Sequence, residues 1–414
     1  MPIDLRSKHM QLLVLSYAAF IALSIPGGAF GVAWLYIQDS FGVTLGALGV
    51  LMAIMSVPRL LVSFFSGAII ARLSIGRFML GGMVLIMVGT SAYVFVTEWW
   101  LFVVVSVIAS IGSSAIINGL NTFIAANYTP RQMNWLHACF GLGATIGPLL
   151  LTFIVLAMGQ SWRVFYLLML ILQVGIGLLI FATRRDWQLG AVPDEKGQDI
   201  HVQADRPETQ VSLLDTLRLP LVWISVTLFF VATGAEINSG QLTTILFVEG
   251  RGIDPGVAGR WLSVYWASLT VGRLVAGAII NKFDPARYLR VNMLWTIVGA
   301  LLLWAHLSDL SSFIGLALMG FTLGPFAPTM YSDTPRLVGL PHATNAIGFQ
   351  NAGAGLGLAL PPLLATILAE RIGLETIGPV LLGLAVVTFV LHEILTLVSN
   401  RQPATQPVPV KRTA

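Results

Sequence analysis

The sequence is short of cysteine and of charge. Cys139 is its single cysteine, so no disulfide can form within the chain and no thiolate cluster is available for a metal. Charged residues are 10% of the chain, whereas soluble domains average about 25%. The sequence has no phosphate-binding loop, no Cys/His metal spacing and no cluster of nucleophile, acid and base. We therefore expect neither an ordinary soluble domain nor an enzyme, and no metal or cofactor.

Long apolar stretches take the place of charge. Hydrophobic residues are 56% of the chain and the mean hydropathy is +0.83. Twelve apolar runs each reach or exceed the roughly 20 residues that cross a hydrocarbon core. These runs are 10–38, 45–71, 78–97, 100–127, 133–158, 162–183, 217–248, 257–281, 288–307, 310–332, 343–369 and 376–399. The sequence therefore predicts an all-α membrane protein with twelve transmembrane helices.

The positions of the basic residues predict the orientation of the chain. An even number of spans places both termini on one side of the membrane. On that side lie 17 of the 23 Lys and Arg residues, whereas the opposite loops hold four and the spans hold two. Basic loops favour the cytoplasm, so we expect a multi-pass protein of the cytoplasmic (inner) membrane with both termini cytoplasmic. The net charge of +4 then reflects orientation and contact with anionic lipid, and we expect no nucleic-acid partner.

The chain repeats itself at about half its length. Residues 67–78 read GAIIARLSIGRF and residues 277–288 read GAIINKFDPARY, with five identities at an offset of 210. Residues 141–150 return as residues 355–364 at an offset of 214. Such a duplication in an apolar chain is typical of transporters built from two like halves, so we expect two pseudo-symmetric six-helix bundles. The expected parts are a cytoplasmic N-terminal segment (1–9), an N-terminal bundle (10–184), a cytoplasmic linker (185–216), a C-terminal bundle (217–400) and a disordered cytoplasmic tail (401–414).

A few polar side chains lie inside the predicted spans. Each one needs a partner in protein, water or substrate, because an unsatisfied polar group in a low-dielectric region costs several kcal/mol. The candidates for substrate binding are Asn121, His137, Glu236, Asn238, Gln241, Gln350 and Asn351. On the repeat alignment His137 corresponds to Asn351, which favours one central site shared by both halves. A partner within the protein is the alternative for Asn121, and a satisfied histidine at a helix end is the alternative for His137.

Two charged residues inside spans have more than one interpretation. Glu236 is the only acid predicted to lie deep in a span, where a carboxyl group can couple proton movement to substrate binding. Alternatively, it has a permanent partner such as Arg59 or Arg273. Arg59 in span two is a candidate for binding an anionic or hydroxylated substrate, and otherwise it pairs within the protein or extends to the membrane surface.

Residues near the cytoplasmic ends of the spans predict a gate. Arg72, Arg77 and Lys282 in the repeated loops can bond the carbonyl groups that end the facing helices. Arg273 lies near the cytoplasmic end of span eight, and we expect it to pair with Asp333. The gate would then open and close through these contacts.

Prolines and aromatic residues predict a hinge and a membrane-surface belt. Pro325 and Pro328 in span ten should bend the helix, because neither can donate a backbone hydrogen bond. Trp261, Tyr265 and Trp266 in span eight could stack on a sugar ring, but we expect them in the aromatic belt at the membrane surface.

A family resemblance rests on four motifs: Gly119-Leu-Asn121, Asn134-x-Leu-His137-x-x-Phe140-Gly-Leu-Gly-Ala144, Gly234-Ala-Glu236-Ile-Asn-Ser-Gly240, and Gly272-Arg273. With them the sequence resembles the fucose:proton symporter family within the major facilitator superfamily, over roughly residues 10–400. The resemblance implies the major facilitator fold, alternating access, and a sugar or polyol carried with protons or sodium. Proton-coupled members carry an acid in span one and another four residues before the span-four Asn. Here span one has no acid between Gln11 and Gln38, and Ile117 stands at the second position.

The leading hypothesis is a secondary active transporter of a small polar solute, a sugar or polyol. Its expected partners are the solute, the lipid bilayer and a proton or sodium ion, and we expect a monomer. The alternative keeps the fold but carries an organic anion or a lipophilic drug, with Arg59 as counter-charge. A sensor is a third class, but the polar loop at 184–216 is too short for an output domain.

Overall fold

Twelve helical segments cross the molecule from end to end. The computed structural model describes residues 5–128, 130–188, 212–279 and 282–401. Within these residues twelve helical segments are long and apolar enough to span a membrane, which confirms the predicted number. The spans are, in order, α1 (Leu5–Phe41), α2 (Leu45–Leu73), α3 (Ile75–Phe95), α4 (Trp99–Asn127), α5 (Pro130–Thr152) with η1 (Phe153–Ala157), α6 (Trp162–Thr183), α8 (Pro220–Ile245) with η3 (Leu246–Gly250), α9 (Pro255–Ile279), α10 (Pro285–Ala305), α11 (Asp309–Leu323) with α12 (Phe326–Val338), α13 (Leu340–Gly357) with α14 (Leu360–Ile372), and η5 (Leu374–Thr376) with α15 (Ile377–Arg401). A short helix, α7 (Leu213–Leu217), precedes α8.

The predicted linker and tail are described only at their edges. Residues 189–211 and 402–414 lie outside the described residues, so the domain boundaries and the disordered tail stay predictions. The bounds of the spans agree with the apolar runs to within a few residues, because charged and turn residues end both.

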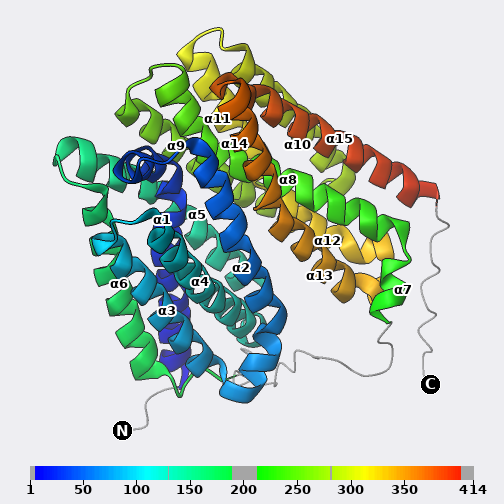
Figure 1. Cartoon of the computed structure of the whole chain (residues 1–414). Coiled ribbons are helices and arrows are strands. Elements are labelled where there is room, and N and C mark those ends of the chain that lie inside the picture. The colour runs from blue at the N-terminus through cyan, green and yellow to red at the C-terminus, as the bar shows by residue number, and fades with distance from the viewer. Residues whose placement is uncertain (1–4, 129, 189–211, 280–281, 402–414) are drawn as a thin grey trace, which may run out of the picture.

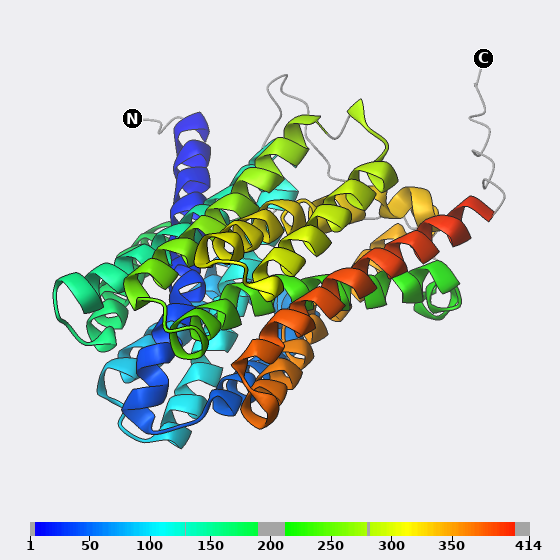
Figure 2. The same cartoon turned by 90° about the horizontal axis from the view of Figure 1, so that it is seen from above.

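The helices form two bundles that lie side by side. Figure 1 shows α1 to α6 in one bundle and α8 to α15 in the other. Figure 2 shows the two bundles from above. We call the face that carries the start of α1 and the end of α15 the terminal face. The opposite face, which carries the loops at Gly42 and Gly373, is the distal face.

Contacts between the bundles repeat across the duplication. Gly49 of α2 packs on Thr366 of α14, and Gly259 of α9 packs on Thr152 of α5. Gly259 follows Gly49 by 210 positions and Thr366 follows Thr152 by 214, which are the offsets of the sequence repeat. The same offsets relate two deeper contacts, Gly355 with Leu60 and Gly141 with Thr270. The two bundles therefore meet through pseudo-symmetric surfaces, as the duplication predicts.

The bundles touch on the distal side and stand apart on the terminal side. Gly67 lies 18 residues after Gly49, about five turns further along the same face of α2. A Cβ added at Gly67 would meet no atom within 4 Å, whereas one at Gly49 would overlap Thr366. Gly277 and Gly259 on α9 have the same spacing and the same contrast. Because one face of each helix is packed at its distal end and free at its terminal end, the bundles diverge towards the terminal face.

Hydrogen bonds between the bundles reinforce the distal contact. Glu370 Oε1 of α14 accepts from the backbone N–H of Gly46, in the first turn of α2, at 2.7 Å. The N-cap residue Thr44 makes no side-chain capping bond, so Glu370 provides this helix with a cap from the other bundle. Gln38 of α1 donates from Nε2 to Glu249 of η3.

The second bundle has more broken helices than the first. Span four is the unbroken helix α4, whereas span ten breaks at Gly324 and Pro325, which confirms the predicted bend. Span five continues through Pro148 within α5, but span eleven breaks just before Pro361 and Pro362. A proline frees the carbonyl four residues earlier from its N–H donor, so two adjacent prolines free two carbonyls and the helix ends.

The aromatic residues of span eight lie inside the protein. Tyr265 is 0% exposed and Trp266 is 6% exposed, with the Trp266 ring packed on Gly240 of α8. Trp261 stacks on Phe313 of α11 with ring centroids 4.8 Å apart. The expected membrane-surface belt is therefore wrong for Tyr265 and Trp266, because α9 packs between α5 and α11 and these two rings fill the core. It stays a prediction for the half-buried Trp261.

Candidate functional site

An ion pair lies in the middle of the second bundle. Arg273 Nη2 of α9 donates to Glu236 Oε1, at the midpoint of span seven, across 3.3 Å. The side chains are 25% and 22% exposed, respectively. Arg273 lies near the terminal end of α9, but Cα–Cβ bonds tilt towards the N-terminus of a helix, which for α9 is on the distal side. The side chain therefore points into the molecule, and Glu236 has the charged partner that was one of its two interpretations.

Arg273 also bonds the broken backbone of span ten. Pro328 has no N–H, so the carbonyl of Gly324 lacks the donor that an unbroken helix would provide. Arg273 Nε donates to that carbonyl at 3.0 Å. Gly272 allows this approach, because a Cβ there would overlap the Phe321 carbonyl of α11. One guanidinium group therefore joins α8, α9 and the break between α11 and α12.

Two tyrosines lie beside the ion pair: Tyr265, which was expected in the membrane-surface belt, and Tyr331, which sequence reasoning missed. Tyr265 OH donates to the backbone carbonyl of Glu236 at 2.7 Å. Tyr331 OH of α12 donates to Asn351 Oδ1 of α13 at 2.6 Å and is close enough to Glu236 for an electrostatic interaction. The side chain of Asn351 is exposed. The available signal was the position of Tyr331, about one turn after Pro328 in the helix that follows the break.

Two predicted candidates of the first bundle are uncharged polar residues, and one of them lies near the ion pair. His137 of α5 is exposed and meets Phe20 of α1 edge-on, with ring centroids 5.9 Å apart. His137 is also close enough to Arg273 of the other bundle for an electrostatic interaction. Asn121 Oδ1 of α4 is buried and has no hydrogen-bond partner among the described residues. A hydroxyl group of a solute or a water would satisfy it.

The predicted amide side chains separate into two groups. Gln350 is fully buried and exchanges hydrogen bonds with Thr334 at 3.0 and 3.1 Å. Asn238 is fully buried as well and donates to the carbonyl four residues earlier in α8 at 2.7 Å. Gln241 instead donates to the Gly27 carbonyl of the other bundle at 3.3 Å, and its Oε1 lacks a partner within the described chain. The structure thus places Gln241 at the junction, and Gln350 and Asn238 inside the second bundle.

Asp333 does not meet Arg273. It bonds Arg336 of its own helix at 2.6 and 2.7 Å, so the predicted pair of Arg273 and Asp333 is wrong. Asp333 lines a polar cavity of about 570 Å³ between α10, α12 and α15 at the terminal end of the second bundle. Asp333 pairs with Arg336 because residues three apart on a helix lie on the same face and are neighbours.

Three of the basic residues expected at the gate are exposed. Arg72, Arg77 and Lys282 are all exposed at the terminal face, where the bundles stand apart. A gate formed by these residues would require the terminal side to close, so their role stays a prediction.

Arg59 belongs to the first bundle. Ser114 Oγ of α4 donates to the Arg59 carbonyl at 3.3 Å, and the guanidinium group interacts electrostatically with Tyr93 of α3. Both neighbours lie in the same bundle as Arg59. The structure therefore does not bring Arg59 to Glu236.

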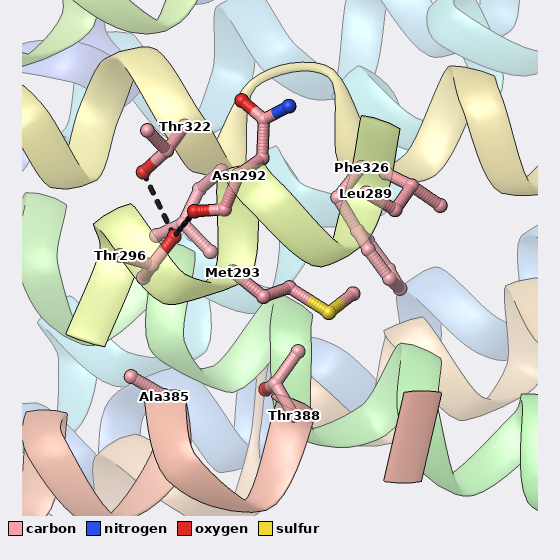
Figure 3. A pocket seen from close by; sticks show the side chains of 9 residues that line it. Leu289, Asn292, Met293, Thr296, Thr322, Phe326, Ala385 and Thr388 are labelled. Atoms are coloured by element: carbon pink, nitrogen blue, oxygen red, sulfur yellow. Dashed lines mark hydrogen bonds between the residues drawn. The ribbon is translucent and has the colours of Figure 1, made fainter. Parts of the chain in front are cut away.

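A small cavity within the second bundle is separate from the ion pair. Figure 3 shows it between α10, α11 and α15, with Thr296 and Thr322 joined by a hydrogen bond of 2.8 Å at one side. Its volume of about 10 Å³ holds roughly one water and no solute. Among the described residues, no three His, Cys, Asp or Glu side chains come together as metal ligands.

Known proteins with similar sequences include several sugar transporters. The chain is 24% identical over 279 residues to the putative glucose/galactose transporter of Helicobacter pylori (strain ATCC 700392 / 26695), covering 64% of each chain. It is 20% identical over 323 residues to the glucose/mannose transporter GlcP of Bacillus subtilis (strain 168), covering 75% of this chain and 77% of GlcP. It is 24% identical over 287 residues to Bypass of stop codon protein 6 of Saccharomyces cerevisiae, covering 63% of this chain and 56% of that protein. The yeast and H. pylori relatives are thus matched over less than two thirds of their length.

Solved structures and a family model agree on the fold. The nucleoside transporter NupG has a TM-score of 0.71 at 13% identity, and the E. coli fucose:proton symporter FucP has a TM-score of 0.62 at 16% identity. Each comparison covers 92% of this chain and 98% of the other. The model described as Major Facilitator Superfamily matches residues 13–248 and 222–412. These matches confirm the predicted fold, and the chain belongs to the major facilitator superfamily.

Proposed function

We propose that the protein is a secondary active transporter that carries a sugar or polyol across a membrane by alternating access. The observation that carries the proposal is the packing of the two bundles, closed on the distal side and apart on the terminal side, with polar groups at their junction. A carrier of this kind exposes one central site to each side in turn. The relatives named as glucose, galactose and mannose transporters support a sugar as the solute.

The terminal face is the cytoplasmic face in this proposal. Its loops and tails carry most of the basic residues, which favour the cytoplasm. The structure then corresponds to a carrier of the inner membrane, open to the cytoplasm, with both termini cytoplasmic. A monomer suffices, because one chain supplies both bundles. Arg72, Arg77 and Lys282 would meet the facing bundle when the terminal side closes.

The solute would bind at the junction through uncharged groups and one ion pair. Asn121, His137, Gln241 and Asn351 offer donors and acceptors that match sugar hydroxyl groups. A mostly neutral site of this kind suits a polyol better than an ion. Gln350 and Asn238 support the site by packing, because their hydrogen bonds lie within the second bundle.

Glu236 is the proposed coupling residue. It lies at the midpoint of a span, and a proton on its carboxylate would cancel the charge that attracts Arg273. Span one offers no acid between Gln11 and Gln38 for this purpose. A sodium ion at the same carboxylate is the alternative.

Uptake into reconstituted vesicles tests the proposal. The panel contains sugars, polyols, organic acids and lipophilic drugs, and pH and sodium gradients are imposed separately, with protein-free vesicles as control. We expect at least one sugar to accumulate under one of the gradients. Transport of organic acids alone would favour the anion carrier with Arg59 as counter-charge, and no movement of any sugar contradicts the proposal.

A further inference from the structure

The break in span ten depends on a side chain from another helix. The Gly324 carbonyl has no backbone donor within the helix, because Pro328 lacks an N–H, and it accepts a hydrogen bond from Arg273 Nε instead. The same guanidinium group uses Nη2 to bond Glu236. Arg273 is therefore held by two acceptors, one at the site where the solute would bind and one at the bend of the helix.

We propose that Arg273 is a positioning residue that couples the state of Glu236 to the bend of span ten. This inference rests on the proposed function, because a hinge has a role only in a carrier that alternates. When Glu236 is protonated, Arg273 loses the charge that attracts it, and a solute hydroxyl that donates to Glu236 Oε1 competes with Arg273 for that acceptor. Arg273 then leaves the Gly324 carbonyl, and α12 is free to move relative to α11.

The geometry of guanidinium explains why the two bonds depend on each other. Its donors form a rigid planar fork, so the bond from Nη2 to Glu236 also sets the direction of Nε, and a rotation away from Glu236 turns Nε away from the Gly324 carbonyl. Gly272 lets the backbone of α9 pack directly against the Phe321 carbonyl of α11, where a Cβ would overlap, so α9 has no room to move towards α11. The backbone of α9 therefore cannot follow the side chain. A change at Glu236 is transmitted through Arg273 and not absorbed by a movement of α9.

Several groups around the pair affect its charge. His137 of α5 is close enough to Arg273 for an electrostatic interaction, and Tyr331 of α12 is close enough to Glu236 for one. Tyr265 of α9 donates to the backbone carbonyl of Glu236. Tyr331 lies on the segment that moves and bonds Asn351 of α13. Movement of α12 would thus change the polar surface offered to the solute, which completes the connection between site and hinge.

Hydrogen exchange of the α12 amides, residues 326–338, tests the coupling in purified protein without solute. Glu236→Gln neutralises the acid, and it is combined with either of two proline variants. Pro328→Ala gives the Gly324 carbonyl a backbone donor, so the carbonyl no longer needs Arg273. Pro325→Ala is the matched control, because it supplies a donor to the Phe321 carbonyl, which Arg273 does not bond.

We expect Glu236→Gln to raise exchange in α12 by roughly threefold to tenfold, the scale of one lost hydrogen bond of ordinary strength. The increase should persist with Pro325→Ala and fall below about twofold with Pro328→Ala. Arg273→Lys keeps the charge but cannot bond both acceptors, and it should reproduce the increase without Glu236→Gln, even if larger substitutions fail to fold.

Two results would overturn the inference. One is unchanged exchange in Glu236→Gln, and the other is the same increase in both proline backgrounds. Either would show that Arg273 only fills a vacant position at the carbonyl. Because the measurement uses no solute, its failure leaves the proposed transport intact, and a failed uptake panel leaves this coupling intact.

Discussion

The two bundles share one duplicated pattern but differ in whether their core helices are continuous or broken. In the first bundle spans four and five pass through the core as the unbroken α4 and α5. In the second bundle the equivalent spans break at Gly324 and Pro325 and again before Pro361. The ion pair of Glu236 and Arg273 also belongs to the second bundle. The comparison indicates that the second bundle holds the ion pair and the hinge, whereas spans four and five of the first bundle are unbroken and carry the uncharged Asn121 and His137.

Removal of the arginine should have the largest effect and tests this asymmetry directly. Arg273→Ala leaves Glu236 without its cation and the Gly324 carbonyl without a donor. Loss of one member of a buried pair costs roughly 3–5 kcal/mol, and solvent access to the pair reduces this figure. We expect at least about a hundredfold loss of vesicle uptake and a lower melting temperature, since tenfold corresponds to about 1.4 kcal/mol.

His137→Ala in the first bundle is the comparison for that prediction. It removes an uncharged group, so we expect less than about a tenfold loss of uptake and an unchanged melting temperature. An equal loss of uptake and of melting temperature in both variants would contradict the proposed difference between the bundles.

Glycine substitutions at the two equivalent distal contacts between the bundles test whether these contacts hold the distal side closed. A Cβ at Gly49 would overlap Thr366 and lie 2.8 Å from the Leu363 Cα, so the backbones must separate. Overpacking of this kind costs roughly 1–3 kcal/mol, so Gly49→Ala should shift the population towards an open distal side by about tenfold. Gly259→Ala should shift it in the same direction but less, because it meets the movable Thr152 side chain.

Gly67→Ala and Gly277→Ala are the matched controls, five turns away on the same helix faces. Neither Cβ meets an atom here, so the distal population should not change. Both variants should instead slow transport by hindering closure of the terminal side. The measurement is the distance between spin labels at Glu98 and Leu307 on the distal face, in a Cys139→Ser background. An equal shift for distal and terminal variants would contradict the divergence of the bundles.

The smallest expected effect concerns a contact between the bundles that is polar at one position and apolar at the equivalent position of the sequence repeat. Glu370 caps α2, while at the equivalent position Leu156 of η1 meets Gly256. The start of α9 does not need a cap from the other bundle, because Asp254 bonds the Val257 N–H itself at 3.0 Å. Glu370→Gln should therefore open the distal side by about threefold through loss of a charged cap.

Leu156→Ala, the apolar counterpart, serves as the control for the cap. It removes packing but no hydrogen bond at a helix end. The ratio of open to closed distal side, measured with the same spin labels, should therefore change by less than about twofold. A larger shift from Leu156→Ala than from Glu370→Gln would show that packing and not the cap closes the distal side.

The candidate site shows where a sequence stops being informative. Glu236, Asn121 and His137 were found because a polar residue within a span is costly and stands out. Gln350 and Asn351 looked equivalent, yet adjacent residues on a helix point about 100° apart. Gln350 turns to Thr334 inside the bundle, and Asn351 turns to Tyr331 and is exposed. The residue types could not distinguish the two roles, because the packing of neighbouring helices decides which face of α13 points into the bundle.

The sequence by itself determined the twelve spans, their grouping into two related halves and the helix break at Pro325. Each follows from a local rule, namely the apolar length needed to cross a hydrocarbon core, self-similarity, and the missing N–H of proline. Only the tertiary structure decided that Arg273 pairs with Glu236 and not with Asp333, that Tyr265 and Trp266 fill the core, and that the bundles close on the distal side. Those outcomes depend on the summed contacts of residues tens to hundreds of positions apart, which no local pattern records.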